Sequence, residues 1–289
     1  MKSFIFLIGL SLCCRFSVFG RKIIDLSYDF GPKSISWPGN PPFNFSHLLK
    51  GRQPGGFWIE KNWFSTNEHR GTHIDAPAHF YPGSPHIHQI PLEDLIGPGI
   101  VLRATKEANE NNDFLMNKDF ILNWEAEHGQ IPHGAIVLLD FDWGRRYLTF
   151  DHNVIFGTKT YNDVSSYHFP GIAADAMTYL VKEKHIKVIG TDATSLDAGQ
   201  TLDYSSHTIC GRYNITIIEN VANLASMPIK GSTVFLAAIK LKGGSGVPAR
   251  VFAFLNDDSF NMAAINIMSS SLITIMIVFS IMSCFSFIL

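Results

Sequence analysis

Cysteine is scarce in this chain of 289 residues, and its four cysteines cannot build a disulfide framework. Cys13 and Cys14 fall in an apolar stretch near the start, and Cys284 falls in another near the end. Only Cys210 remains between them, so the region between the two stretches can form no disulfide within itself. The fold must therefore depend on its hydrophobic core, which 46% hydrophobic residues can supply.

An excess of basic charge is missing as well. The chain has 23 Lys and Arg against 25 Asp and Glu, a formal net charge of −2. Proteins that bind nucleic acid present a basic face, so nucleic acid is not an expected partner. A Gly-x-Ser-x-Gly motif is also absent, which leaves serine-hydrolase chemistry without support. Without repeats or a long low-complexity linker, one domain is the expected organisation.

The start of the chain has the pattern of a secretory signal. Lys2 precedes the apolar run 4–14, and small residues follow before residue 20. A basic start, a short apolar run and a small residue near a cleavage point are typical of export signals, so residues 1–20 are predicted to be a signal peptide. A membrane anchor is the alternative, but the run is shorter than the ~20 residues that span a bilayer. Export would make the sequons at Asn44 and Asn214 available for glycosylation.

The end of the chain predicts attachment to a membrane. No charged residue follows Asp258, and residues 272–289 are almost wholly apolar. Small and polar residues followed by a terminal apolar tail are typical of a glycosylphosphatidylinositol (GPI) anchor signal. A transmembrane tail helix is the alternative. We therefore expect residues 21–258 to form the mature domain, with residues 259–289 directing it to the cell surface.

Between the two ends the sequence predicts a strand-rich α/β domain. Apolar runs bounded by Gly, Pro or Asp indicate buried strands. These runs are Lys22–Leu26, Gly99–Arg103, Ala135–Asp140, Val188–Thr191, Ile215–Glu219, Val234–Ile239 and Val251–Leu255. Helical spacing of apolar residues predicts helices at Asn117–His128 and Ile172–His185. The polar stretch 104–118 is expected to be an exposed loop.

The most specific segment of the sequence is residues 69–80, which carries four potential metal ligands at odd positions. These are His69, His73, Asp75 and His79. Side chains two residues apart share a face of an extended chain, so the four would point the same way. On a strand His73 and Asp75 would lie ~6.6 Å apart along the chain, close enough to bind one ion.

The other two histidines are expected to have different roles. His69 is too far from His73 on an extended chain unless the chain bends, and Gly71 permits such a bend. His79 is as far beyond Asp75, so it better suits proton transfer beside the metal. Imidazole and carboxylate ligands without thiolate favour zinc or manganese over a structural zinc site.

The motif His69-x-Gly71-Thr72-His73-x-Asp75-x-Pro77-x-His79 resembles that of the cyclase family, which includes bacterial-type kynurenine formamidases and isatin hydrolases. Further matches extend over nearly the whole mature chain. They are Asp25-Leu26-Ser27, Trp37-Pro38-Gly39, Phe169-Pro170-Gly171, Gly190-Thr191-Asp192, Ser195-Leu196-Asp197 and the stretch from Gly243 to Arg250. The second metal-binding stretch of the family matches His207 and Ile218-Glu219-Asn220.

The resemblance implies a fold, a metal site and an oligomer. The fold would be a single domain of the swivelling β/β/α type, commonly dimeric or tetrameric. One metal would be held by His69, His73 and Asp75, and Asp75 would bridge to a second metal on His207 and Glu219. The ions would be one or two Zn²⁺, with Mn²⁺ as the alternative. His79 would be the catalytic acid or base.

These residues predict a metal-dependent amide hydrolase. A bound divalent ion lowers the pKa of its water and polarises the amide carbonyl. The first expected reaction is hydrolysis of N-formyl-L-kynurenine to L-kynurenine and formate, in tryptophan catabolism. Opening of isatin or another cyclic amide is an alternative reaction, and an inactive surface-anchored binding protein is an alternative of another class. The complete ligand set counts against the inactive protein. Aromatic residues could wall the substrate pocket, namely Trp37, Phe57, Trp58, Trp63 and Phe64.

Overall fold

A computed structural model of the chain describes residues 22–256. The predicted signal peptide and C-terminal anchor lie outside these residues. Across the described part of the chain, the helices are all too short or too polar to span a bilayer.

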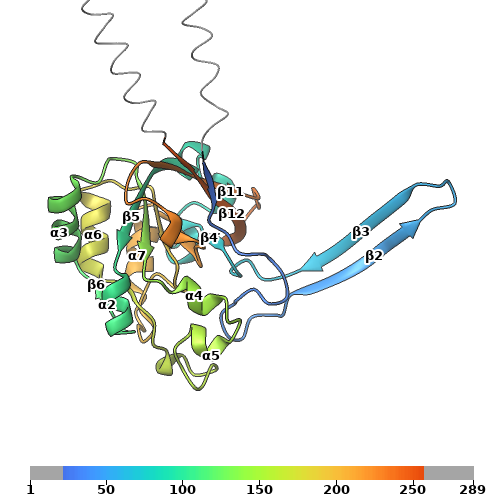
Figure 1. The fold of residues 1–289 in the computed structure, drawn as a ribbon, viewed down its shortest axis with the longest axis horizontal. Coiled ribbons are helices and arrows are strands. Elements are labelled where there is room, and N and C mark those ends of the chain that lie inside the picture. Colours follow the sequence, from blue (N-terminus) through green and yellow to red (C-terminus); the bar gives the residue numbers. More distant parts are fainter. Residues whose placement is uncertain (1–21, 257–289) are drawn as a thin grey trace, which may run out of the picture. The chain divides into compact units, whose positions relative to one another are not determined.

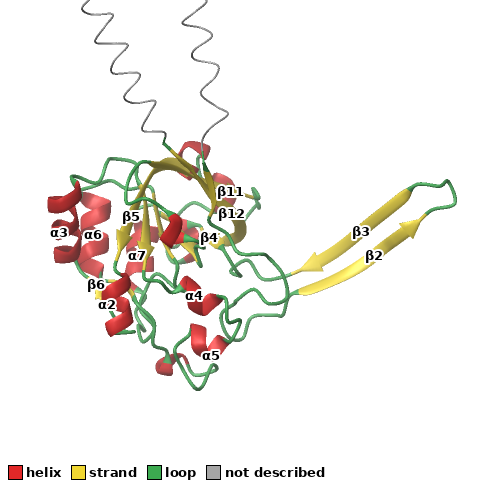
Figure 2. Cartoon of the chain, in the orientation of Figure 1, coloured by secondary structure: helices red, strands yellow, loops and turns green. Residues whose placement is uncertain are grey.

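The centre of the domain is an eight-stranded mixed sheet that curls into a ring (Figures 1 and 2). Its strand order is β1 (Ile23–Asp25), β12 (Gly246–Leu255), β11 (Ser232–Ala238), β5 (Ile96–Arg103), β7 (Ile136–Asp140), β9 (Val188–Thr191), β10 (Thr216–Glu219) and β4 (His73–Asp75). An additional pairing of β4 with β12 closes the seven strands from β12 to β4 into a ring, and β1 is added at its edge beside β12. β12 can pair with both β4 and β1 because it is ten residues long: its first residues face β4 and its last residues face β1.

The strands form where the sequence predicts them. Each of the seven predicted runs contains or overlaps a strand of this sheet. β5, β7, β9 and β10 are parallel neighbours, and β7, β9 and β10 are fully buried. Parallel strands buried on both faces read as continuous apolar runs, which is why they can be recognised. The predicted strand-rich α/β fold is confirmed.

Two longer helices cover one side of the sheet (Figure 1). α3 (Lys118–His128) begins after Asn117, whose side chain accepts a hydrogen bond from the backbone of Phe120. α6 (Ala174–Lys182) buries Met177 and Leu180 in the core. Both helices were predicted, although α6 is shorter than the run 172–185.

The prediction of a loop over residues 104–118 is wrong. The stretch contains helix α2 (Thr105–Glu110) and strand β6 (Leu115–Met116), which pairs with β8 (Gly171–Ile172). Both elements are short and are fixed by the buried side chains of Ala108 and Met116 rather than by a periodic pattern. The remaining helices are α4 (Gly144–Tyr147), α5 (His152–Ile155) and α7 (Ser205–Arg212).

A hairpin projects from the ring (Figure 1). Its strands are β2 (Asn44–Arg52) and β3 (Trp58–Ser65), which pair only with each other. Both faces are exposed, and they carry large apolar side chains: Phe45, Leu48, Leu49, Phe57, Trp58, Trp63 and Phe64. This hairpin is not among the elements predicted from the sequence. Its mixed faces lack the alternation that marks a strand with one buried side.

Candidate metal centre

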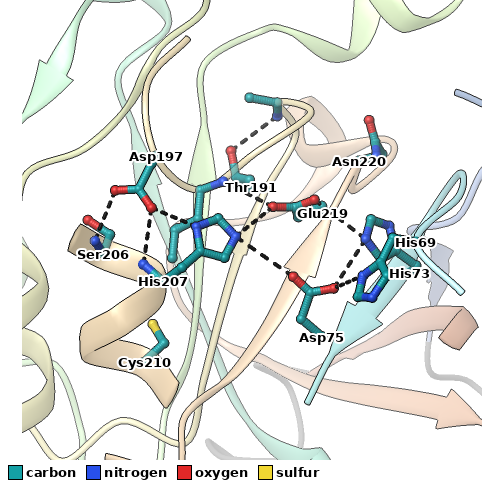
Figure 3. Close-up of polar contacts among 12 residues, drawn as sticks. His69, His73, Asp75, Thr191, Asp197, Ser206, His207, Cys210, Glu219 and Asn220 are labelled. Atoms are coloured by element: carbon teal, nitrogen blue, oxygen red, sulfur yellow. Dashed lines mark hydrogen bonds and ion pairs between the residues drawn. The ribbon is translucent and has the colours of Figure 1, made fainter. Parts of the chain in front are cut away.

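The predicted ligands meet where β4 closes the ring. β4 lies between β10 and β12, and its His73 is directly opposite Glu219 of β10. Opposite residues of an antiparallel pair project on the same side of the sheet, so His73 and Glu219 approach each other. Asp75, two residues further along β4, points to the same side. Figure 3 shows that His207 of α7 reaches the same point.

Asp75 is the centre of this cluster (Figure 3). Its Oδ1 lies 2.6 Å from His69 Nδ1 and 3.3 Å from His73 Nε2. Its Oδ2 faces His207 Nε2 at 3.8 Å. Glu219 bridges the same histidines, with Oε2 3.4 Å from His73 Nε2 and Oε1 3.2 Å from His207 Nε2. The structure therefore brings together all five side chains that the sequence analysis selected as ligands.

Two of the histidines are held with Nε2 toward the carboxylates. The Nδ1–H of His73 donates to the carbonyl of Gly71 at 2.9 Å. The Nδ1–H of His207 donates to Asp197 at 2.6 Å, and that carboxylate also accepts from the backbone of Ser206 and His207. A partner on one ring nitrogen fixes the orientation and the tautomer of the ring.

The electrostatics of the cluster balance buried negative charge with positive charge. Burial alone would lower the pKa of His73, but the nearby carboxylates of Asp75 and Glu219 raise it to about 9. Burial opposes the charged form of His207 in the same way, but hydrogen bonds to Asp197 and Glu219 raise its pKa to about 10. Burial would raise the pKa of Asp75, yet its histidine neighbours hold it well below its usual range. Positive charge is therefore favoured beside these carboxylates, either as protons on the histidines or as a bound cation.

The donor set fits a divalent metal. His73 Nε2 is buried and has no hydrogen-bond partner, although two carboxylate oxygens lie close to it. Two triads have ligand atoms near enough to one another for one ion, His73–Asp75–Glu219 and His69–Asp75–His79. Imidazole and carboxylate donors suit zinc or manganese. Asp75 belongs to both triads, so it is the residue that could bridge two ions.

The path of the chain around the cluster agrees with one prediction and corrects another. Gly71 has φ +62°, a conformation that favours glycine, and this bend places His69 beside Asp75 as expected. The extended path that would carry His79 away from the metal is wrong. Pro77–His79 forms a 3₁₀ turn, and the His79 ring stacks on that of His69 with 4.0 Å between centroids.

His79 lies at the mouth of the cluster. The residue is exposed as a whole, but protein crowds its ring on the side that faces the cluster. This desolvation, which outweighs the charge of Asp75, lowers the pKa of His79 to about 4. Its position beside His69 allows proton transfer at the cavity and also brings it within reach of a metal.

A cavity of about 370 Å³ opens over the cluster. Besides the metal-binding side chains, three aromatic residues line it: Trp37, Phe80 and Tyr204. Only Trp37 was among the aromatics predicted for the pocket, because the others belong to the hairpin or to residues beside it. Two other cavities of about 440 Å³ each lie elsewhere, but neither is lined by a histidine. We assign the site to the smaller cavity because its chemistry, rather than its volume, suits a metal.

Fold and cluster together define a metal-dependent hydrolase of the cyclase type. The chain belongs to the family described as "Putative cyclase", whose model matches residues 24–198. It is 32% identical to an isatin hydrolase of Roseibium aggregatum over 75% of this chain and 82% of that protein. It is 26% identical to a kynurenine formamidase of Bacillus anthracis over 69% of this chain and 82% of that protein. Among solved structures, isatin hydrolase A from Labrenzia aggregata, bound to benzyl benzoate, superposes with a TM-score of 0.75. It is 29% identical, with 86% of this chain and 100% of that chain covered.

Proposed function

We propose that this protein hydrolyses the amide bond of an aromatic cyclic amide of the isatin type, opening the ring to a carboxylate. The observation that carries the proposal is the 32% identity with an isatin hydrolase over 75% of this chain. The aromatic wall of Trp37, Phe80 and Tyr204 beside the cluster supports a flat aromatic substrate. This proposal replaces formylkynurenine, the first substrate expected from the sequence, with the second.

The residues of the chain divide the work between binding and proton transfer. His69, His73, Asp75, His207 and Glu219 would hold one or two divalent ions, zinc first and manganese as the alternative. When bound, such an ion supplies Lewis acidity, which makes water nucleophilic near neutral pH and stabilises negative charge on the amide oxygen.

The remaining groups act on the substrate and on protons. His79, at the mouth of the cavity, would take a proton from the attacking water and return it to the leaving nitrogen. Asp197 and the carbonyl of Gly71 keep two imidazoles fixed while this occurs.

A second candidate substrate is N-formyl-L-kynurenine. The similarity to a kynurenine formamidase, at 26% identity, favours it. Both substrates present an amide nitrogen attached to an aromatic ring, so the same cluster and the same proton donor would serve either reaction.

The test is a substrate panel with metal added back. The purified protein would be freed of metal, loaded with zinc or manganese, and assayed on isatin, N-formyl-L-kynurenine and formanilide. We expect metal-dependent turnover, highest on isatin. Faster turnover of formylkynurenine would favour the second candidate. Tight metal binding without hydrolysis of any member would favour an inactive binding protein.

We also propose that the enzyme is displayed outside the cell on a lipid anchor, from the composition of the chain ends. Asn44 on β2 and Asn214 before β10 are both exposed, so each sequon is accessible to glycosylation. In an animal cell line, the surface protein should carry glycan and be released by phosphatidylinositol-specific phospholipase C. Protein that resists the lipase but dissolves in detergent would favour a tail helix, and a cytosolic product without glycan would contradict export.

A further inference from the structure

His69 differs from the other two histidines of the cluster in what fixes it. Neither a backbone carbonyl nor a carboxylate holds the ring nitrogen that points away from Asp75. Instead, His69 Nε2 lies 3.0 Å from the hydroxyl of Ser245, in the turn before β12. The same ring presents Nδ1 to Asp75 at 2.6 Å.

Ser245 is itself held by a second acidic residue. Its hydroxyl oxygen lies 2.7 Å from Glu68 Oε2. That carboxylate oxygen also accepts from the backbone N–H of Ser245 at 2.9 Å and of Gly246 at 3.2 Å. Three donors therefore converge on one carboxylate oxygen. These hydrogen bonds hold the turn that contains Ser245 beside His69, although the two residues are 176 positions apart in the sequence.

Only one placement of hydrogen atoms is consistent with the contacts among Glu68, Ser245 and His69. A serine hydroxyl has one hydrogen, and a carboxylate can only accept. The hydroxyl must donate to Glu68, because two oxygen lone pairs would otherwise face each other at 2.7 Å. Its remaining lone pairs then face His69, so Nε2 carries a hydrogen and donates to Ser245.

Packing leaves the His69 ring little freedom to avoid this arrangement. A Cβ at Gly246 would lie 2.4 Å from His69 Cε1, so the ring rests against glycine backbone. The ring of His79 also stacks on it. His69 therefore has a fixed plane as well as a fixed hydrogen.

We propose that Glu68 and Ser245 are positioning residues that present Nδ1 of His69, rather than Nε2, to the metal. The proposal rests on the metal centre of the proposed function. It makes His69 the opposite of His73 and His207, whose Nδ1 is occupied and whose Nε2 faces the carboxylates. Neither positioning residue touches the cavity, since neither lines it.

The test uses the full chain and measures metal binding apart from turnover. In Ser245→Ala the hydroxyl is lost while the backbone donors to Glu68 remain, and in Ser245→Thr the hydroxyl is kept. The matched control is Ser84→Ala, which removes a part-buried hydroxyl bonded to the carbonyl of Gly211. Cobalt and zinc affinities would be measured by competition with a chelator, together with the visible absorption bands of the cobalt-loaded protein.

We expect Ser245→Ala to bind both metals about 10–100-fold more weakly, the range for loss of a group that orients a ligand. The cobalt bands should shift, Ser245→Thr should restore affinity and spectrum, and Ser84→Ala should change neither. Affinity and spectrum in Ser245→Ala that match those of the unchanged protein would overturn the proposal.

Two further outcomes separate this proposal from the proposed function. If Ser245→Ala does not fold, Glu68→Gln takes its place, because its amide oxygen still accepts for the turn. It should show a smaller loss of affinity, and no change of affinity or spectrum in it would overturn the proposal. If the unchanged protein binds cobalt but does not hydrolyse isatin, the proposed substrate is refuted. The metal affinities and cobalt spectra of the variants still test the role of Glu68 and Ser245 in that case. An unchanged protein that binds no cobalt would overturn both.

Discussion

Replacement of Asp197 by asparagine should weaken metal binding without altering any residue that holds the metal. The carboxylate of Asp197 accepts from His207 Nδ1 at 2.6 Å and from two backbone N–H groups at the start of α7. Burial would raise its pKa, but these hydrogen bonds and the charge of His207 outweigh burial and lower it. Asp197 is therefore ionised and acts only as an acceptor.

An asparagine at this position can reverse one hydrogen bond. Oδ1 of Asp197 accepts from the backbone of Ser206, whereas Oδ2 accepts from both the backbone and Nδ1 of His207. In the orientation that keeps the asparagine oxygen on Ser206, the NH₂ group therefore faces His207 Nδ1. The ring would have to accept at Nδ1 and carry its hydrogen on Nε2, the atom that faces Glu219 at 3.2 Å. A protonated Nε2 has no lone pair for a metal. Metal binding therefore requires the tautomer with its hydrogen on Nδ1, and in that tautomer the hydrogen bond between Nδ1 and residue 197 is lost.

The loss of metal affinity can be estimated from the loss of this hydrogen bond. A hydrogen bond to a charged group contributes about 1.5–3 kcal/mol. At about 1.4 kcal/mol for each factor of ten, this corresponds to a loss of metal affinity of roughly 10–100-fold. The same range is found when groups that orient metal-binding histidines are removed.

The assay is zinc affinity by chelator competition on folded protein, with helix content checked by circular dichroism. Asp203→Asn is the matched control, because Asp203 is an exposed acidic residue just before the same helix. Asp197→Asn with unchanged zinc affinity would refute the reasoning that Asp197 sets the tautomer of His207. An equal loss in Asp203→Asn would show that the charge near α7, rather than the hydrogen bond, is what matters.

Three further predictions concern catalysis, stability and assembly. His79→Ala should keep most of its metal and lose roughly 10²–10⁴-fold in turnover, the range for general acid–base catalysis; loss of metal in parallel, measured by elemental analysis, would make His79 a ligand. Burial opposes ionisation of Glu125, but its 2.8 Å ion pair with Lys184 lowers its pKa from the ordinary value of 4.5. Its stabilising contribution is therefore present above pH 4.5 and is lost as the pH falls through the lowered value. Glu125→Gln should reduce stability by about 3 kcal/mol at pH 7, as expected for breaking a buried pair, and by much less in acid; an equal loss at both pH values in thermal melts would contradict this. Because isolated hairpins are marginal in water and Trp58 and Trp63 are exposed on this one, we expect a dimer in which the hairpin is covered. Light scattering should give twice the monomer mass, and Trp58→Ser with Trp63→Ser should reduce it; an unchanged dimer would exclude the hairpin as the interface.

The parts of the fold that could be predicted are those whose pattern is local. Continuous apolar runs such as 136–140 and 188–191 are typical of strands buried on both faces, and they form such strands. The cluster was recognisable because His73 and Asp75 are two residues apart on one strand. His207 and Glu219 came from the resemblance to a family, since nothing in the sequence places residues 73 and 219 opposite each other.

The features that could not be predicted depend on contacts between distant segments. The pairing of Glu68 with Ser245 joins residues 177 positions apart, and no spacing rule indicates it. The turn at Pro77 that brings His79 back was missed because an extended path was assumed beyond Asp75. Trp58 and Trp63 were placed at the pocket because aromatic composition does not show which element a residue belongs to.

The closure of the ring at β4 has a consequence for biosynthesis. β4 is three residues long and finds its two neighbours in β10 and in the start of β12, up to Pro248. At about 5–20 residues per second, a ribosome needs roughly ten seconds or more to reach β12 after it has made β4. Until β10 has been made, His73 and Asp75 have no strand beside them, and the ring stays open until β12 follows. The complete set of proposed ligands exists only after His207 and Glu219 have been made, and metal bound there would stabilise the last contacts to form.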